Sequence, residues 1–440
     1  MTMKVGVLGA GISGIGAALL AKSRGHEVWV SDGMEINAER KNILATNKIP
    51  FEEKGHSIER LVACDIIVKS PGISNKSDIL RALNDAGKEV IGEIEWAYRN
   101  AEGKIIGITG SNGKTTTTGL CHHFLHEAGI DAAKVGNVGE GFCHFLAEHK
   151  ADWYVCELSS FQLEDLEAFR PQIAILLNIT PDHLDRYEYN LDKYADAKMR
   201  IVQAMTEEDT LIYNAMDPLT VAKVVSTHME SRLWSIRETD LIDDDKVYVQ
   251  DDLILDLSRS KLMGVHNQVN VIAAARAALL AGCPGESLQS SLESFVNESH
   301  RMEWAGVHDE VGYINDSKAT NVDAVYYALG AMKTPVIWIA GGLDKGNDYG
   351  PIMDLVKNKV KALICLGLDN SKLYDAFSTT VYYISETTTM REAVRRAASH
   401  ASPGDTVLLS PACASFDLFR DYRDRGDQFK KEVSELEKNV

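Results

Sequence analysis

The sequence lacks the features that would place it in an oxidising compartment or in a membrane. Its seven cysteines are odd in number and scattered, and no two of them form a C-x-x-C pair, which argues against a disulfide framework and a zinc site. No apolar run is long enough for a transmembrane helix. The apolar N-terminus is broken by glycines and is typical of a strand, a turn and a helix rather than of a signal peptide. We therefore expect a cytoplasmic protein.

Positive charge is also scarce. The 440 residues contain 46 Lys and Arg against 64 Asp and Glu, a formal net charge of −18. Such a chain as a whole repels nucleic acid and anionic membranes, so neither is expected as a partner. An anionic nucleotide could still bind, through backbone N–H groups, a few local cations and a metal ion. The hydrophobic fraction of 45% and the charged fraction of 25% are ordinary for a globular protein.

The chain is too long for one compact core. Patterns of short apolar strands alternating with helices start afresh near residues 4, 93 and 301. Continuous apolar strands between helices indicate mainly parallel sheets covered on both faces. We predict three consecutive α/β domains at 1–92, 93–298 and 299–440: a Rossmann-like domain, a central P-loop ATPase-like domain and a second Rossmann-like domain. The polar stretch 231–263 is interpreted as hairpins at the edge of the middle domain.

The strongest local motif lies at residues 105–116, where the buried-strand pattern IIGIT runs into GSNGKTT. Glycines let a backbone curl so that its N–H groups face phosphate oxygens. Lys114 would then neutralise phosphate charge and Thr115 would bind Mg²⁺. The spacing G-x-x-G-K-T is shorter than the standard phosphate-loop motif. The alternative is a plain strand-to-helix turn with a capping threonine.

A second glycine turn, GAGISG at residues 9–14, follows the first strand, and Asp32 ends the next strand. This G-x-G-x-x-G pattern suggests a dinucleotide site with Asp32 on a ribose hydroxyl. The motif is weak alone. The turn could equally hold the nucleotide end of a substrate, or no ligand.

Polar residues follow several other predicted strands. Glu157 and His183 could join Thr115 around Mg²⁺, because ligands gather at the carboxyl ends of parallel strands. Lys318 and Lys345 suit phosphate or carboxylate partners, as does Arg301, but each could be a loop charge in water. Taken alone, Lys198 is typical of a solvated helix lysine.

These motifs together resemble the Mur ligase family over the whole chain. The matching segments, in order, are TGSNGKTTT, ELSSFQLE, NITPDHLDRY, ADAKMR, GVHNQVNVIAA, SHRMEW and NDSKATN. The ending SPACASFDLFRDYRDRGDQF resembles most closely the branch that adds D-glutamate. The resemblance implies an ATP-dependent amide ligase of peptidoglycan precursor synthesis. It would join D-glutamate to UDP-N-acetylmuramoyl-L-alanine through an acyl phosphate, as a monomer acting on small molecules.

The resemblance also implies residue roles. ATP would be bound by Gly110, Ser111, Asn112, Gly113, Lys114, Thr115, Thr116, Asn267, Asn270, Arg301 and Asp316. Two Mg²⁺ sites would use Thr115, Glu157, His183 and a carbamylated Lys198. The groups assigned to catalysis are Lys114, His183, Lys198 and Lys318, with His183 or a metal-bound group as alternatives for taking the amine proton.

Two further sets complete the implied site. The UDP-substrate would contact Ile12, Ser13, Ser31, Asp32, Ser70, Gly72, Asn137, Ser159 and Gln162. D-Glutamate would contact Thr320, Lys345, Ser415 and Tyr422. The alternatives are a sister ligase for another amino acid and an NAD(P)-dependent oxidoreductase built on the first glycine turn. The oxidoreductase would leave the Lys-Thr loop and the third domain without a role.

Overall fold

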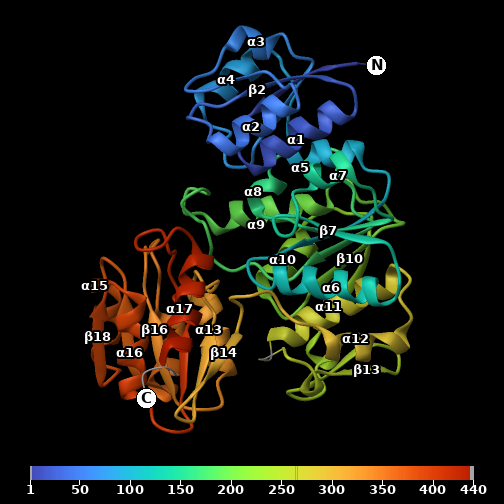
Figure 1. The fold of residues 1–440 in the computed structure, drawn as a ribbon. Helices are drawn as coiled ribbons and strands as arrows, with labels where there is room; N and C mark the ends of the chain where they lie inside the picture. Colours follow the sequence, from blue (N-terminus) through green and yellow to red (C-terminus); the bar gives the residue numbers. More distant parts are fainter. Residues whose placement is uncertain (1, 263, 265, 437–440) are drawn as a thin grey trace. The chain divides into compact units, whose positions relative to one another are not determined.

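The structure is a computed structural model that describes residues 2–262, 264 and 266–436 (Figure 1). It divides into two compact units. Unit 1 contains the described residues up to Ile242, Val247–Leu255 and Val269–Leu292, and unit 2 contains Asp243–Lys246, Asp256–Gln268 and the chain from Glu293 onward. Each unit is described by itself.

The first sheet of unit 1 is parallel and has the order β3-β2-β1-β4-β5. The order reverses beside β1, so the turns after β1 and β4 meet at one edge, where open α/β sheets bind ligands. Its strands are β1 (Lys4–Leu8), β2 (Glu27–Ser31), β3 (Phe51–Glu52), β4 (Ile66–Lys69) and β5 (Val90–Gly92).

The second sheet of unit 1 is also parallel, in the order β11-β10-β9-β6-β8-β7. Here the order reverses at β6, which lies between β8 and β9, so the loops after these strands share one edge. The strands are β6 (Lys104–Thr109), β7 (Ala132–Gly136), β8 (Trp153–Glu157), β9 (Ile173–Leu176), β10 (Thr210–Asn214) and β11 (Arg232–Ile236).

The polar stretch after residue 230 contains both an edge strand and a hairpin. Strand β11 joins β10 in parallel, while β12 (Lys246–Gln250) and β13 (Leu253–Asp256) form a separate two-stranded sheet. The predicted hairpin is therefore confirmed, with alternating burial along β12. Met263, the end of the predicted stretch, lies outside the described residues.

Helices of unit 1 connect its strands. Helix α1 packs closely on α7, and α5 contacts both (Figure 1). A Cβ at Gly16 of α1 would lie 2.9 Å from the backbone N of His144, so a side chain there would push the helices apart. The helices are α1 (Ile12–Ser23), α2 (Ala38–Thr46), α3 (Ile58–Val62), α4 (Asp78–Asp85), α5 (Glu93–Asn100), α6 (Lys114–Glu127), α7 (Phe142–Glu148), α8 (Ser160–Leu163), α9 (Leu191–Met199) and α10 (Pro218–Ser226).

Two further helices and several short 3₁₀ turns complete this part of the chain. Helix α11 (His266–Leu280) begins with residues of unit 2 and continues in unit 1, and α12 (Leu288–Ser294) follows. The 3₁₀ turns are η1 (Arg200–Val202), η2 (Glu238–Asp240), η3 (Leu257–Arg259) and η4 (Gly285–Ser287).

The sheet of unit 2 has the order β14-β15-β19-β16-β17-β18, parallel except for the β14–β15 pair. The register of that antiparallel pair shifts between Trp304 and Gly306, which marks a β-bulge in the edge strand. The strands are β14 (Glu303–His308), β15 (Val311–Asn315), β16 (Val336–Ala340), β17 (Val360–Leu366), β18 (Tyr383–Thr387) and β19 (Thr406–Leu409).

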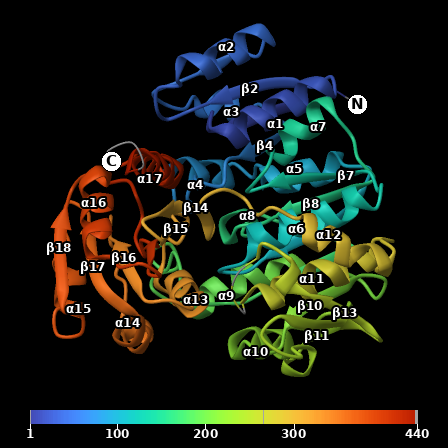
Figure 2. The same ribbon diagram turned by 60° about the horizontal axis from the view of Figure 1, so that its bottom comes forward.

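Helices cover both faces of this sheet (Figure 2). One apolar core joins α13, α14 and α15 to Trp338 and Leu408, and another joins α16 and α17 to Ile337 and Val407. Successive strand residues thus face opposite cores. The elements are α13 (Val322–Ala331), η5 (Gly350–Ile352), α14 (Met353–Lys359), α15 (Ser371–Phe377), α16 (Met390–His400) and α17 (Tyr422–Leu436).

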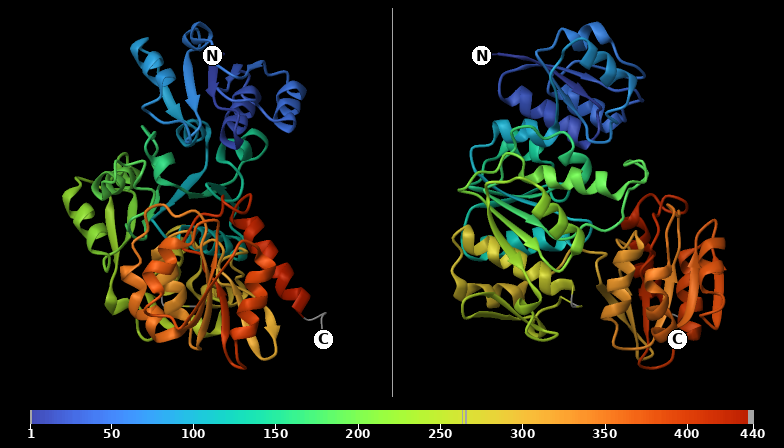
Figure 3. Two further views of the ribbon diagram at one scale, coloured as in Figure 1. Left: turned by 90° about the vertical axis from the view of Figure 1, so that its left-hand side faces the viewer. Right: turned by 180° about the vertical axis from the view of Figure 1, so that it is seen from behind.

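The prediction of consecutive α/β regions with mainly parallel sheets is confirmed by the three larger sheets formed across the described ranges (Figure 3). All seven cysteines are buried free thiols. Among the described residues no helix is both long enough and apolar enough to cross a bilayer.

Candidate active site

The turn between β6 and α6 has the backbone shape that its glycines predict. Gly110 has φ +155° and Gly113 has φ +85°. A Cβ at Gly113 would lie 2.4 Å from Oδ1 of Asn270, so both the conformation and the space require glycine. Helix α6 begins at Lys114, directly after the turn. Its N-terminal N–H groups and partial positive charge therefore face the turn, as an anion site requires.

The turn is held by the segment after β9. Asn178 accepts a hydrogen bond from Asn112 N at 2.8 Å and donates one to Asn112 O at 3.1 Å. The hydroxyl of Ser111 donates to Thr180 O at 2.8 Å and lies 3.1 Å from the hydroxyl of Tyr194. Sequence reasoning gave Asn178 and Tyr194 no role. The sequence feature that could have identified them is their position, Asn178 in the NITPDHLDRY segment and Tyr194 directly before the ADAKMR segment.

Two lysines converge on one carbonyl oxygen of this turn. Lys114 Nζ donates to Gly110 O and Ser111 O, each at 2.7 Å, and Lys198 Nζ donates to Gly110 O at 2.8 Å. Lys198 is only 1% exposed and lies over the Tyr194 ring. Burial, reinforced by the charge of Lys114, lowers the pKa of Lys198 well below its usual value. Lys198 is thus a buried amine rather than the solvated lysine that it resembles in isolation.

Glu157 ends β8 beside this turn and is 1% exposed. Its Oε1 accepts a hydrogen bond from Asn137 Nδ2 at 2.8 Å, whereas its buried Oε2 has no hydrogen-bond partner within the described part of the chain. An unpartnered buried carboxylate oxygen is costly unless a cation or water binds it. Together with the buried hydroxyl residue Thr115 at the start of α6, it fits the oxygen ligands that Mg²⁺ prefers.

His183 lies on the loop after β9 with φ +51°. Its ring packs edge-on against Phe161 at 5.1 Å, and Nε2 is 3.7 Å from Asp182 Oδ2. Within the described ranges no group of three or more His, Cys, Asp or Glu side chains has metal-binding geometry. A cation here would therefore need oxygen ligands from substrate, water or a modified Lys198 as well.

The adenine-side candidates lie at the start of α11. Asn267 and Asn270 are both buried. Oδ1 of Asn270 accepts a hydrogen bond from the Thr117 hydroxyl at 3.2 Å, which ties α11 to α6. Thr116 is buried in the first turn of α6.

In the first sheet, the predicted UDP contacts gather at the ends of β1, β2 and β4. Asp32 Oδ2 accepts a hydrogen bond from Ala10 N at 2.6 Å, and Oδ1 accepts one from Met34 N. Ile12 is exposed and Ser13 is half-buried at the start of α1. Ser70 Oγ donates to Gly9 O at 3.4 Å.

Two of the predicted UDP contacts differ in exposure. Ser31 is fully buried, and its hydroxyl already contacts Glu52 Oε1 at 2.8 Å and His56 Nδ1 at 2.7 Å. Gly72 is exposed. Glu52 and His56 are polar neighbours of this edge that the sequence patterns did not single out.

Ser159 and Gln162 form the N-terminal cap of α8. Gln162 N donates to Ser159 Oγ at 3.3 Å, and Ser159 N donates to Gln162 Oε1 at 3.0 Å. Such a reciprocal pair satisfies two of the helix's free donors. The two side chains are therefore fixed in place directly after Glu157 and its strand.

In unit 2, Asp316 and Lys318 follow β15. Asp316 accepts hydrogen bonds from Met302 N at 3.2 Å and Ser410 Oγ at 3.0 Å. Burial raises the pKa of Asp316 to about 7. Lys318 Nζ lies 3.8 Å from the centre of the Tyr422 ring, a cation–π contact that brings two predicted site residues together.

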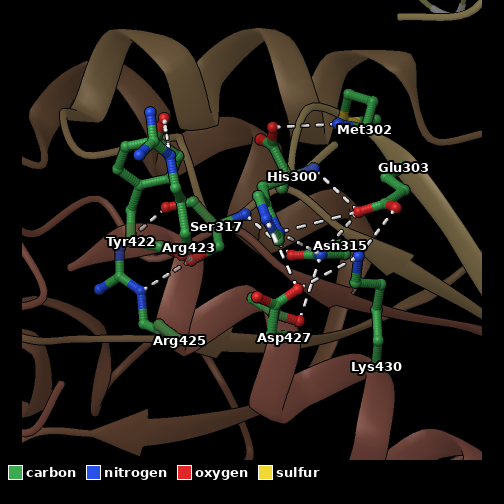
Figure 4. Close-up of polar contacts among 12 residues, drawn as sticks. His300, Met302, Glu303, Asn315, Ser317, Tyr422, Arg423, Arg425, Asp427 and Lys430 are labelled. Carbon is green, nitrogen blue, oxygen red and sulfur yellow. Dashed lines mark hydrogen bonds and ion pairs between the residues drawn. The ribbon is translucent and has the colours of Figure 1, made fainter. Parts of the chain in front are cut away.

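A polar network supports this loop (Figure 4). Asn315 Nδ2 lies 3.0 Å from His300 Nδ1 and donates to Glu303 Oε2 at 2.9 Å. Lys430 donates to Glu303 Oε1 at 3.1 Å. The start of β14, the end of β15 and helix α17 are thereby joined.

Arg425 is the buried centre of the same region. Its guanidinium donates to Ser317 O at 2.9 Å, Cys413 O at 3.2 Å and Gly341 O at 3.3 Å. These carbonyls belong to the loops after β15, β19 and β16, so one side chain fixes three strand-end loops. Sequence reasoning missed Arg425, although it lies in the quoted RDRGDQF segment.

The remaining predicted D-glutamate contacts lie on the loops that Arg425 joins. Thr320 is half-buried, Lys345 is exposed and Ser415 is buried. Asp344 turns the Lys345 loop by accepting from Gly346 N at 2.7 Å, and it pairs with Lys372 at 3.0 Å. Arg301, two residues before β14, is half-buried in the same unit.

Comparison with known proteins identifies the family. The chain matches the MurD N-terminal domain over residues 4–79, the Mur ligase middle domain over 108–278 and the Mur ligase glutamate ligase domain over 300–413. A UDP-N-acetylmuramoylalanine–D-glutamate ligase of Cytophaga hutchinsonii is 45% identical and covers 99% of this chain and 100% of its own. That of Christiangramia forsetii is 43% identical with the same coverage. The chain belongs to the Mur ligase family.

Solved structures agree on the Mur ligase fold. A UDP-N-acetylmuramate–alanine ligase of Thermotoga maritima superposes with a TM-score of 0.62 at 19% identity, covering 100% of both chains. A pseudomurein peptide ligase of Methanothermus fervidus gives 0.61 at 18% identity, covering 99% of this chain and 100% of that one. At such identities the likeness concerns the fold alone.

Proposed function

We propose that this chain is an ATP-dependent ligase that joins D-glutamate to UDP-N-acetylmuramoyl-L-alanine with release of ADP and phosphate. The full-length relatives at 43% and 45% identity carry that activity in their names. The observation that carries the chemistry is the turn at 110–113, where two lysines meet on Gly110 O next to Glu157.

The proposed reaction begins with phosphorylation of the substrate carboxylate. The carboxylate oxygen attacks the γ-phosphorus of ATP, the bond to ADP breaks, and an acyl phosphate forms. Lys114 would leave its present carbonyl partners to offset phosphate charge, since an ammonium binds a phosphate oxygen more strongly than a neutral carbonyl. Lys318 is the proposed second cation on the transferring phosphate.

The second step forms the amide. The amine of D-glutamate attacks the acyl carbon, and phosphate leaves with its bonding electrons. Thr320, Lys345, Ser415 and Tyr422 are proposed to hold the amino acid. Positioning and electrostatics lower the barrier, and His183 is the candidate to take the amine proton.

Magnesium fits the unit 1 site through Thr115 and Glu157. Bound there, it would neutralise charge on the phosphate oxygens. We propose a second Mg²⁺ held through His183 and a carbamylated Lys198. The support is that Lys198 is a buried amine of lowered pKa. Its neutral nitrogen can attack CO₂, losing a proton and gaining a carboxylate-like group.

The proposal divides the chain at 92/93 and 298/299. Residues 1–92 would bind UDP, 93–298 ATP, and 299–440 the amino acid. It is supported by the end of β5 at Gly92 and the start of β14 at Glu303. We propose a cytoplasmic monomer whose partners are these small molecules.

The decisive assay measures phosphate release from ATP with UDP-N-acetylmuramoyl-L-alanine, screened across D-glutamate, L-alanine, L-lysine and diaminopimelate. We expect release with D-glutamate alone. Release with another amino acid would identify a sister ligase, and binding of NADH without release would favour an oxidoreductase.

Lys114→Ala tests the phosphate turn within that assay. Removing this charge should lower turnover at least about 10³-fold. The exposed Lys150→Ala, whose side chain pairs with Glu102 at the surface, serves as control. Near-normal turnover of Lys114→Ala would refute the assignment of the turn.

A further inference from the structure

Lys69, the last residue of β4, is buried although it carries a charge. Its side chain is 2% exposed and its Nζ lies 2.6 Å from Oδ2 of Asp165, whose side chain is 6% exposed. These two atoms form an ion pair, but their angles are not those of a hydrogen bond. Lys69 Nζ also donates to Ile73 O at 3.2 Å. The pair joins two segments far apart in the sequence and lies entirely within unit 1.

Lys69 and Asp165 each lie next to a different part of the proposed substrate site. Lys69 directly precedes Ser70 and Gly72, the proposed contacts for the nucleotide end. Asp165 follows α8, whose capping residues Ser159 and Gln162 are the proposed contacts for the muramoyl-alanine end.

Arg186 joins the same two segments independently. Its Nη1 donates to Pro71 O at 3.2 Å. The guanidinium binds both carboxylate oxygens of Glu164, at 3.2 and 2.8 Å, and lies over the Phe161 ring at 4.2 Å. Asn75 adds a hydrogen bond to Asp165 Oδ1 at 3.1 Å.

A buried ion pair is held more firmly than an exposed one, because water cannot readily replace either partner. A ligand that must be held at both ends binds best when its two sites are already at the right separation. The buried pair and the Arg186 contacts supply such a fixed separation between residues 70–72 and α8.

We propose that Lys69 and Asp165 are positioning residues that set the distance between the nucleotide-binding loop and the acceptor-binding helix. A substrate that spans both is thereby held with its carboxylate in place for phosphorylation. This inference rests on the proposed function, and neither side chain is assigned a contact with substrate.

The test compares UDP alone with UDP-N-acetylmuramoyl-L-alanine in Asp165→Asn and Lys69→Met, by calorimetry and by KM. UDP occupies only one side of the link, so its affinity should stay within about twofold. The KM of the full substrate should rise at least about tenfold, while the KM of ATP stays unchanged. An equal loss for UDP and for the full substrate would overturn the proposal, since the pair would then only order the loop.

Two double variants separate positioning from stability. Lys69→Met with Asp165→Leu removes both charges and should restore the melting temperature but not the KM. Lys69→Asp with Asp165→Lys restores a pair and should recover part of the KM. Recovery of the KM by the apolar pair would show that the ion pair is only structural. If Lys69→Met does not fold, the milder Asp165→Asn still decides between these outcomes.

Lys76 and Glu188 provide a matched control. Lys76, in the loop after β4, pairs with Glu188, in the loop before α9, at 2.5 Å, but their side chains are 72% and 53% exposed. Exposed pairs contribute little, so Lys76→Ala should leave both affinities unchanged. A wild-type protein that neither binds the full substrate nor turns it over would refute the proposed function itself, not the role of the pair.

Discussion

Lys198 in unit 1 and Arg425 in unit 2 are both buried basic side chains, each 1% exposed. Both donate to main-chain carbonyl oxygens at the carboxyl edge of a parallel sheet. Within the described residues neither forms an ion pair with a carboxylate. They differ in what burial does to them.

Burial lowers the pKa of Lys198 well below its usual value, and the nearby Lys114 lowers it further. Burial also lowers the pKa of Arg425, to about 10, which leaves it charged at neutral pH. A buried lysine can therefore become a neutral, reactive amine, whereas a buried arginine remains a charged guanidinium that donates hydrogen bonds in a fixed geometry. The same kind of burial therefore lowers the basicity of a lysine in one unit and leaves a charged arginine that joins three loops in the other.

The largest effect is expected at Lys198. Lys198→Ala should lower phosphate release at least about 10³-fold, because the proposed carbamate ligand could no longer form. Added formate or acetate should restore part of the activity by supplying the missing carboxylate. Lys193→Ala, on the exposed side of the same helix, should remain near wild type. A complete lack of rescue at any carboxylate concentration would speak against carbamylation.

Arg425→Ala should instead act on stability. It leaves the carbonyls of Ser317, Gly341 and Cys413 without their donor, and we expect a loss of about 3–5 kcal/mol. Hydrogen exchange of β15, β16 and β19 would measure it within unit 2. Arg425→Lys should recover only part of this stability, since an ammonium lacks the planar set of donors of a guanidinium. Arg420→Ala, with an 88% exposed side chain, should change stability by less than about 0.5 kcal/mol.

The unit 2 edge should also show a pH dependence through Asp316. Because burial raises the pKa of Asp316 to about 7 from about 3.9 when unfolded, the folded state binds its proton more tightly. Stability is therefore greatest at low pH and falls as the pH rises from about 4 through 7.

Between about pH 5 and pH 8 this contribution should amount to about 2–3 kcal/mol. Asp316→Asn should flatten the dependence, measured by hydrogen exchange of β15 at both pH values. An unchanged slope in the variant would assign the titration to another group.

The smallest expected effect lies in the turn that Lys198 binds. Gly113→Ala should cost about 2 kcal/mol, because φ is +85° and the new Cβ would meet Asn270 Oδ1. Gly129 has φ +72° but open space around it, so Gly129→Ala should cost only about 1 kcal/mol. ATP affinity, measured by calorimetry, should fall only for Gly113→Ala. If both variants lost the same stability and neither lost ATP affinity, backbone strain alone would explain the result, and the contact with Asn270 would have no role.

The sequence identifies interior strands better than edge strands. The run IIGIT marks β6, because an interior strand of a parallel sheet is buried on both faces. The patterns did not name the interior strand β15, nor β3, β5, β7 and β14, which are edge strands. Such strands carry polar or small residues that resemble loops.

The site shows a similar division. Glycine turns and the residues after interior strands can be recognised because backbone geometry dictates them. Asn178 and Arg425 could not be recognised from the sequence, because their roles depend on which carbonyl and amide groups the fold brings to them. Lys198 could be identified only through the family resemblance, since a helix lysine carries no sign of burial in its own sequence.

The bulge in β14 has a consequence beyond the site. An outer strand offers a row of N–H and C=O groups that another molecule can extend into a continuous ribbon. The extra residue between Trp304 and Gly306 breaks the regularity of that row, and the Trp304 ring lies over Gly312 on the neighbouring strand. This outer strand of the unit 2 sheet is thereby a less regular template for pairing with a further strand.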